Sequence, residues 1–510
     1  MSFPEAAVTE NSPRREPAAG NQSRALRDCL LLAGLVVVGA VLRFLFLGKK
    51  SFWFDEGVSV QIAGLDWYNF GRILWRREAN MSLYYLCLRG WLQFGHSEFL
   101  VRSLSAVFGV LNVPAIYYLG RQLFDSRTGQ MAALLLAVNG FHIAYSQEAR
   151  SYSLFVLLST LSALFFVESL ANPSPRNLRL HVTASVLAMY AHLFAVLLII
   201  AEWISTPIRS GSGQIQRNWR LIGGLVSPLL LFVVTTGTGP LAWIRRPGFD
   251  DLWAVLLALC GNGGWLLALS YLLTCALAAL PGARESNHAL QAYQWGKRFL
   301  LVWIAFPLLA MFLVSQFRPV FLTRYFIFLL PPLALLGALG LRRLSSPWRA
   351  AATLIFLLGL SLHAARTFYA QSLNLEHEDW RSATRYVLSQ AHGGDALIFH
   401  TAMGRMPFEY YRWEQGGPSV LSPHTSDRIT YRDFIAHPDP DVLASASQGY
   451  ARTWIVLSHN QNKLADSPDP LTRRLTEVFG IYYSQVETRN FPGVDVYLYS
   501  GARHPSGQSP

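Results

Sequence analysis

Two adjacent carboxylates stand just after the first long apolar run of the chain. Residues 52–57 read Phe-Trp-Phe-Asp-Glu-Gly, which places Asp55 beside Glu56. Burying an unpaired carboxylate in lipid is unfavourable, so we expect both side chains to face water, a cation or a bound polar substrate. A carboxylate within reach of a substrate hydroxyl can act as a general base. A solvated loop with two ordinary surface acids is the alternative reading of the pair.

Two further segments carry residues suited to chemistry on a phosphate. Residues 145–152 read Tyr-Ser-Gln-Glu-Ala-Arg-Ser-Tyr and hold Glu148 and Arg150 between two apolar runs, while Arg324 and Tyr325 open another apolar run. The planar guanidinium of arginine matches the oxygens of a phosphate group. An interfacial ion pair in the first segment, and an arginine that only anchors a helix end in the second, are the alternatives.

The composition indicates a membrane protein with many spans. Of the 510 residues, 52% are hydrophobic and only 15% are charged, whereas soluble domains carry about 25% charged residues. The net charge of +12 comes mostly from basic residues between apolar runs, so it indicates membrane topology and no nucleic-acid partner. The four cysteines show no close spacing that would predict a disulfide framework or a zinc site.

Several segments reach the roughly 20 residues needed to cross a bilayer. They lie at residues 28–47, 99–121, 128–146, 151–170, 219–237, 254–280, 298–316, 322–341 and 350–368. Residues 81–97 are short and contain Arg89, which favours an interfacial or half-embedded helix. With the segment described next, about eleven crossings are predicted.

The segment 180–207 has basic residues on both sides. Arg179 precedes it and Arg209 follows it, and because basic residues concentrate on the cytoplasmic side, both ends are expected there. A hairpin of two short helices that turns near residues 190–192 satisfies this requirement.

The same rule places the N-terminus inside and the C-terminus outside, and we expect a multi-pass protein of the inner (plasma) membrane. Arginines on the outer face run against the charge bias, which makes them candidates for function. The candidate residues on the outer face are Asp55, Glu56, Glu148, Arg150, His192, Arg318 and Arg324.

The composition changes near residue 370, where charged residues, Pro and Gly become frequent. We therefore predict a disordered cytoplasmic tail over residues 1–25, a membrane domain over 26–370 and a small α/β domain over 371–510 on the outer face. Strands and helices in the last domain are predicted at 395–399, 453–458, 481–487 and 495–499, and at 378–391 and 470–478, respectively.

The order of these motifs resembles that of a known family. The segments that carry the resemblance are residues 52–57, 80–85, 102–109, 145–152, 190–192 and 323–325. Together they are similar to the bacterial GT-C membrane glycosyltransferases related to protein O-mannosyltransferases and to the aminoarabinose transferase of lipid A. The resemblance covers residues 25–370 and implies an α-helical polytopic GT-C fold.

The resemblance implies transfer of a sugar, hexose or pentose, from a polyprenyl-phosphate donor to a lipid, glycan or protein acceptor at the outer face. Asp55, with Glu56 beside it, matches the family's essential acid, which acts as a general base or helps to position a metal. Glu148 matches the second outer acid. Arg150 and Arg324 match the residues that grip the lipid-linked phosphate, and inversion at the sugar is expected.

Four further residues belong to the predicted site. Tyr325 and Arg318 are candidates for the donor phosphate, and Asn80 and His192 for other contacts. Relatives often carry His-Pro-Pro-Leu where this chain has Asn80-Met-Ser-Leu. Asparagine is a poor metal ligand compared with His or Glu, so the sequence leaves the metal unknown and a divalent cation possible.

Two other functions are compatible with parts of the sequence. A transporter or flippase for lipid-linked sugars would place charges near the bilayer midplane and often shows internal repeats, whereas here the charges cluster at the outer boundary and no repeat is seen. A membrane-anchored protein whose outer domain binds a partner is the third alternative.

Overall fold

A computed structural model of the chain describes residues 19–206, 213–236, 244–280, 288–400, 402–415, 429–434, 439–458, 461–462, 467–468 and 470–503. The chain forms two compact units. The first comprises Met1–Leu47, Arg76–Tyr84 and Arg102–Ala370, and the second comprises Gly48–Trp75, Tyr85–Val101 and Gln371–Pro510. Residues 1–18 of the predicted tail, and Arg209, lie outside the described residues.

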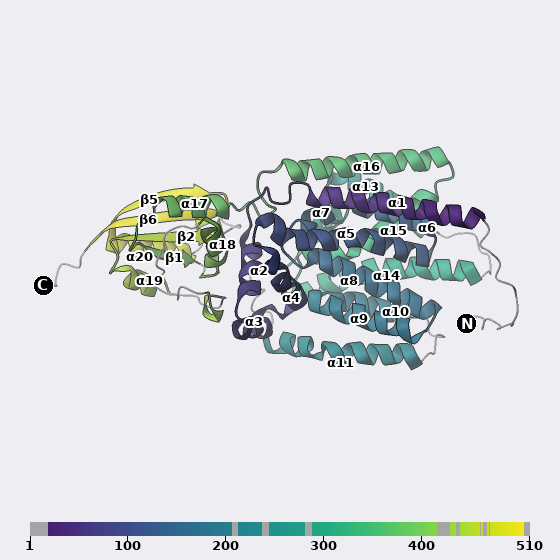
Figure 1. Ribbon diagram of the computed structural model, residues 1–510, viewed down its shortest axis with the longest axis horizontal. Helices are drawn as coiled ribbons and strands as arrows, with labels where there is room; N and C mark the ends of the chain where they lie inside the picture. Colours follow the sequence, from purple (N-terminus) through teal and green to yellow (C-terminus); the bar gives the residue numbers. More distant parts are fainter. Residues whose placement is uncertain are drawn as a thin grey trace. The chain divides into compact units, whose positions relative to one another are not determined.

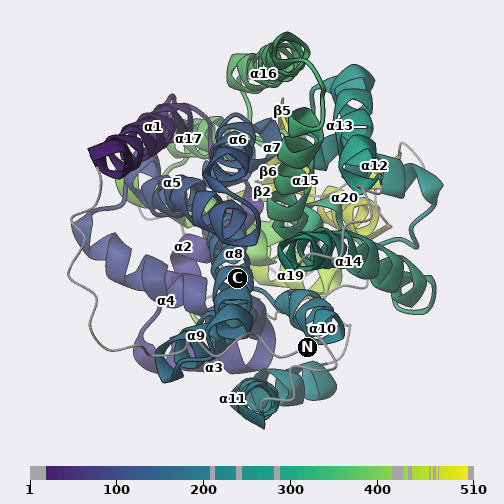
Figure 2. The same ribbon diagram turned by 90° about the vertical axis from the view of Figure 1, so that its right-hand side faces the viewer.

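The first unit is a bundle of helices that run alongside one another (Figure 1), and an end-on view places α8 near its centre (Figure 2). Its helices are α1 (Ala19–Phe44), α5 (Glu98–Leu123), α6 (Ser126–Ala137), α7 (Gly140–Ser146), α8 (Tyr152–Ala171), α9 (Pro175–Ala191), α10 (Ala195–Ser205), α11 (Gly213–Thr236), α12 (Phe249–Leu259), α13 (Gly264–Ala279), α14 (His288–Phe317), α15 (Leu330–Arg342) and α16 (Pro347–Ala370). Two short 3-10 segments, η2 (Ala79–Met81) and η5 (Thr323–Leu329), complete it.

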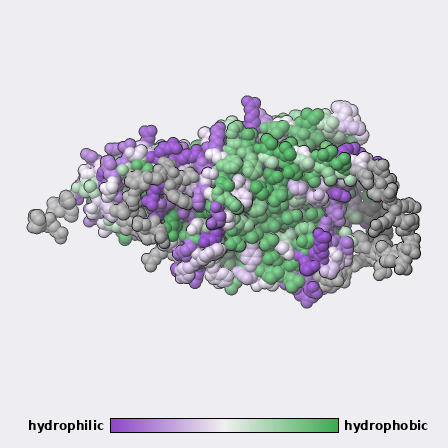
Figure 3. Space-filling model, in the orientation of Figure 1, coloured by the Kyte–Doolittle hydropathy of each residue, from purple (hydrophilic) through white to green (hydrophobic). Residues whose placement is uncertain are grey.

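This unit has the surface of a protein that spans a membrane many times. The face of this unit seen in Figure 3 is mainly hydrophobic, and large apolar side chains such as Leu30, Val234 and Leu309 are exposed. Among the described residues, seven helices are long and apolar enough to cross a bilayer, and the bent pair α12–α13 would make an eighth. The fold is therefore that of a polytopic α-helical membrane protein.

The predicted number of about eleven crossings exceeds this count for a local reason. The predicted span 128–146 is divided into α6 and α7, because Asn139 caps α7 by accepting a hydrogen bond from the His142 N–H at 2.9 Å. At Gly140 a Cβ atom would lie 2.5 Å from the carbonyl oxygen of Gly261. The two arms of the hairpin, α9 and α10, are also shorter than the spans in this count.

The predicted hairpin is confirmed. Helix α9 ends at Ala191 and α10 begins at Ala195. His181 near the start of α9 pairs with Glu202 near the end of α10, with 3.1 Å between Nε2 and Oε2, so the two arms are antiparallel. Ser162 of α8 donates a hydrogen bond to the other Glu202 oxygen at 2.9 Å, which ties the hairpin to the centre of the bundle.

Replacing Glu202 should weaken the bundle. Glu202→Ala removes one partner of the buried Ser162 hydroxyl, which also contacts Ser185, and the partner of His181 Nε2, and leaving a buried polar group such as this ring nitrogen unpaired costs about 1–3 kcal/mol. The purified variant should therefore unfold at a lower temperature than the natural protein. Glu477→Ala, at an exposed position of the second unit, serves as the control, and equal unfolding temperatures for the two variants would contradict the expectation.

The second unit contains a mixed four-stranded sheet in the order β1-β2-β6-β5. Its strands are β1 (Ala396–His400), β2 (Arg452–Ser458), β5 (Tyr483–Phe491) and β6 (Val494–Ala502). β1 and β2 are parallel and the other pairs are antiparallel. Side chains alternate along a strand, so Ile455 and Leu457 join the core with α19 (Pro440–Ser447) and α20 (Pro470–Tyr482). The small α/β domain predicted for this region is confirmed.

Short helices complete the second unit. They are α2 (Phe54–Gly64), α3 (Trp67–Ile73), α4 (Ser82–Trp91), α17 (Trp380–Gln390) and α18 (Arg405–Gln415). The chain passes between the units within α4 and α5. Beyond the predicted tail, the predicted domains divide the chain once, at residue 370, whereas the second compact unit also takes in residues 48–75 and 85–101.

Candidate active site

In the first unit, Glu148 and Arg150 lie in the short connection between α7 and α8, and both are buried. Gln147 donates a hydrogen bond from its side chain to the carbonyl oxygen of Arg43 at 3.0 Å. Ser105 of α5 donates to the carbonyl oxygen of Arg150 at 3.1 Å. Neighbouring helices therefore hold the connection at both ends, and they fix the backbone from which the Glu148 and Arg150 side chains extend.

A buried arginine organises the helix break behind this connection. Arg43 of α1 is completely buried and donates to the carbonyl oxygen of Ala137 at 3.0 Å and to His142 Nδ1 at 2.7 Å. A Cβ atom at Gly109 of α5 would collide with Ser146 and with the Arg43 side chain. This explains the glycine at position 109. The role of Arg43 gave no signal in the sequence, where it is one basic residue at a helix end.

His192, in the turn between α9 and α10, lies among aromatic rings. Its ring stacks on Phe155 of α8, with 4.8 Å between centroids, and meets Tyr325 of η5 edge-on at 5.0 Å. The positive charges of Arg150 and Arg324 both act on this buried ring. Segments from three parts of the sequence thus bring four of the predicted site residues together.

The hydrogen bonds of His192 define its neutral form. The Phe194 N–H donates to Nδ1 at 3.3 Å, so the proton of the neutral ring is assigned to Nε2. Nε2 is buried and has no hydrogen-bond partner among the residues that the structure describes. Nε2 is therefore a hydrogen-bond donor with no acceptor among the described residues, and the positive charges of two guanidinium groups act on the same ring.

Asn80 and Arg318 differ from the other predicted residues. Asn80 Oδ1 accepts a hydrogen bond from the Leu193 N–H at 2.8 Å, so this side chain holds the α9–α10 turn beside His192. Arg318 is exposed just after α14, whereas Arg324 is half-buried. Arg324 is therefore more shielded from solvent than Arg318, and the roles of both at the donor phosphate stay predictions.

In the second unit, Asp55 and Glu56 lie in the first turn of α2, where the helix dipole favours negative charge. Asp55 is half-buried, and Glu56 is completely buried with its Oε2 accepting a hydrogen bond from the Trp53 N–H at 3.4 Å. Their catalytic roles, and a cavity shared with Glu148 and Arg150, stay predictions. Within the described residues, no group of three or more His, Cys, Asp or Glu side chains could hold a metal ion.

The backbone in front of Asp55 is held by residues from the C-terminal part of the chain. The Phe52 N–H donates to the Tyr411 hydroxyl at 2.6 Å, and the Phe54 N–H donates to Glu378 Oε2 at 2.7 Å. In the sequence, the only signal for these contacts is the charged stretch that opens the C-terminal region. That stretch does not distinguish Glu378 or Tyr411 from their neighbours.

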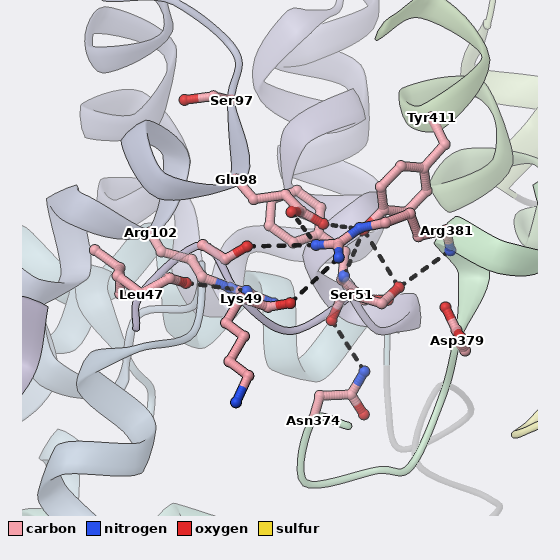
Figure 4. Close-up of polar contacts among 12 residues, drawn as sticks. Leu47, Lys49, Ser51, Ser97, Glu98, Arg102, Asn374, Asp379, Arg381 and Tyr411 are labelled. Carbon is pink, nitrogen blue, oxygen red and sulfur yellow. Dashed lines mark hydrogen bonds and ion pairs between the residues drawn. The ribbon is translucent and has the colours of Figure 1, made fainter. Parts of the chain in front are cut away.

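An ion pair supports this arrangement (Figure 4). Arg381 pairs with Glu98 and donates to the carbonyl oxygen of Lys49 at 3.2 Å, and the Tyr411 hydroxyl donates to Glu98. Burial, followed by the negative charge of Glu98, raises the pKa of Tyr411. The phenol therefore keeps its proton, as a donor to Glu98 requires.

Comparison with known proteins gives two kinds of match. Residues 83–236 match the family model described as dolichyl-phosphate-mannose-protein mannosyltransferase. No curated protein matches the chain.

The solved structures extend the likeness to nearly the whole chain. ArnT from Cupriavidus metallidurans in the apo state matches with a TM-score of 0.62 and 12% identity, over 93% of this chain and 98% of that one. ArnT bound to undecaprenyl phosphate matches with a TM-score of 0.55 and 15% identity, over 94% and 98% of the two chains. The predicted resemblance to the GT-C membrane glycosyltransferases is therefore confirmed, and this chain has the fold of ArnT.

Proposed function

We propose that this protein is a membrane glycosyltransferase that moves a sugar from a polyprenyl-phosphate donor to an acceptor at the non-cytoplasmic face. The observation that carries the proposal is that the charges of Arg150 and Arg324 both act on the buried ring of His192, whose Nε2 is a hydrogen-bond donor. Two cations and a neutral donor suit a phosphate diester better than a neutral ligand. The fold of ArnT, which has been solved with undecaprenyl phosphate, supports a lipid-linked phosphate.

The proposed reaction needs one base and one leaving group. The acceptor hydroxyl oxygen forms a bond to the sugar C1 while the bond from C1 to the phosphate oxygen breaks, which inverts C1 and releases polyprenyl phosphate. Asp55 takes the hydroxyl proton, and Arg150 and Arg324 stabilise the charge that develops on the departing phosphate.

A transfer assay tests the proposal. The full-length protein in proteoliposomes is supplied with undecaprenyl phosphate sugars labelled in the sugar, together with envelope lipids, glycans and proteins as acceptors. We expect the label to move to an acceptor as undecaprenyl phosphate is released. Movement of the intact donor between leaflets with no transfer would replace the proposal with the flippase alternative.

Arg324→Lys should impair the use of the donor. Lysine keeps the charge but loses the planar pair of donors that fits phosphate oxygens, so undecaprenyl phosphate should raise the unfolding temperature of the variant less than that of the natural protein. Arg318→Lys is the matched control, because Arg318 is exposed. If Arg318→Lys alone reduces the effect, the phosphate ligand is Arg318 instead.

A further inference from the structure

We propose that Glu378 is a positioning residue, which holds the start of α2 and thereby aims the Asp55 carboxylate. The inference rests on the proposed role of Asp55 and assigns the C-terminal region a part in the reaction. The C-terminal region is then more than a separate appendage, because it completes the acidic segment, residues 52–57.

The contact itself is short and buried. Glu378 Oε2 accepts hydrogen bonds from the Phe54 N–H at 2.7 Å and from the Trp380 indole N–H at 2.8 Å. Phe54 is the first residue of α2, and the first amides of a helix have no acceptor within the helix. Glu378 supplies that acceptor at the residue directly before Asp55. The direction of the first turn of α2 therefore depends on where this carboxylate lies.

Glu378 is in turn fixed by its surroundings. Asn374 accepts the Glu378 N–H at 3.1 Å and donates to the Glu378 carbonyl oxygen at 2.8 Å. In the turn between β5 and β6, Gly493 has φ +67°, and a Cβ atom there would lie 2.7 Å from Glu378 Cγ. Asn374 thus holds the backbone of Glu378, and the side chain packs against the turn between β5 and β6. Both restraints limit the positions that the carboxylate can take beside α2.

The body of α2 packs against the same part of the chain. A Cβ atom at Gly57 would lie 2.6 Å from Cα of Pro407 in α18, and Gln61 donates to the Met406 carbonyl oxygen at 3.4 Å. With α18 against its side and Glu378 at its start, α2 has little freedom to rotate. A shift of about 1 Å in a catalytic group can lower a rate by about 100-fold, so this restraint bears on the reaction.

The titration of Glu378 can be followed without an activity assay, through the dependence of the protein's stability on pH. Burial raises the pKa of Glu378 to about 7, the negative charges of Asp55 and Glu376 act in the same direction, and the hydrogen bonds from Trp380 and Phe54 oppose it. Because the pKa in the folded protein is raised, the contribution of this group to stability is present in acid and is lost as the pH rises through about 7. Glu378→Gln should therefore lose less stability than the natural protein between pH 5.5 and 8.

The test compares Glu378→Gln with Glu378→Asp. Glutamine keeps a carbonyl oxygen in place and removes the charge, whereas aspartate keeps the charge and withdraws the acceptor. We expect Glu378→Gln to retain most of the turnover, and Glu378→Asp to lower it by roughly 10- to 100-fold with an unchanged donor Michaelis constant. Glu487→Gln and Glu487→Asp, at an exposed position of β5, are the matched controls.

Hydrogen exchange at the Phe54 amide provides a measurement that needs no activity. The amide should exchange faster in Glu378→Asp than in the natural protein and at a near-natural rate in Glu378→Gln. Natural exchange and turnover in both variants, or an active aspartate variant beside an inactive glutamine variant, would overturn the positioning role. If the natural protein transfers no sugar, the proposed function fails on that result, while the exchange rates still decide whether Glu378 holds α2.

Discussion

Asp55→Asn is expected to lower the rate of sugar transfer by about two to four orders of magnitude while donor binding survives. Asparagine has the size of aspartate but accepts a proton poorly, so only the step that needs a base is affected. Asp55 is half-buried in the first turn of α2, where a change to a neutral amide should disturb the helix little. Turnover and the unfolding temperature with undecaprenyl phosphate, measured together, separate loss of chemistry from loss of binding.

Glu56 provides the internal control for this experiment. Its carboxylate is completely buried and accepts a hydrogen bond from the Trp53 N–H at 3.4 Å, a bond that the oxygen of glutamine can keep. Glu56→Gln should therefore cost less activity than Asp55→Asn. Near-natural transfer by Asp55→Asn would remove Asp55 from the mechanism. Equal losses in both variants that an added divalent cation reverses would indicate a metal shared by the two acids.

Arg150→Gln should reduce turnover by about 100- to 1,000-fold, the usual effect of removing a donor that stabilises developing charge. Arg150 is only 8% exposed, so its charge is weakly screened by water. Its backbone is held by Ser105, so the connection between α7 and α8 should keep its place in the variant. The measurement is single-turnover transfer with saturating donor, which reports the chemical step rather than binding.

Arg349→Gln is the control for Arg150→Gln, because Arg349 is exposed near the start of α16 and the substitution removes the same charge. The two variants should differ by nearly the whole effect. If both lose activity equally, the loss reflects the net charge of the protein, and Arg150 has no special part in stabilising the phosphate.

Much of the fold follows from patterns that are local in the sequence. Long apolar runs predict helices such as α5 and α8, and β-branched residues predict the strands of the sheet. Basic residues on both sides of one apolar segment predict the α9–α10 hairpin. The break at Asn139 leaves almost no signal in the sequence, because a cap inside an apolar run changes the composition by a single residue.

The site was predictable only where its residues stand out from apolar surroundings. Arg150, His192 and Arg324 are polar residues at the ends of apolar runs, and the structure brings them together. Glu378 and Tyr411 belong to a region with many polar residues, where no local pattern distinguishes them. Their contacts with the acidic segment are to the backbone amides of Phe52 and Phe54, which every residue except proline carries, so the amino-acid types at positions 52 and 54 hold no clue to the pairing.

The residues that hold the acidic segment are synthesised long after the segment itself. Phe54 and Glu378 are 324 residues apart, and Phe52 and Tyr411 are 359 apart. At roughly 5–20 residues per second, a ribosome needs about 16–72 s to make the chain between them. Asp55 is thus synthesised early, but the start of α2 receives its acceptors only after α16 has been made. A chain that stops before residue 378 carries the acidic segment without the groups that hold it, so nascent and prematurely terminated chains should be inactive in the membrane.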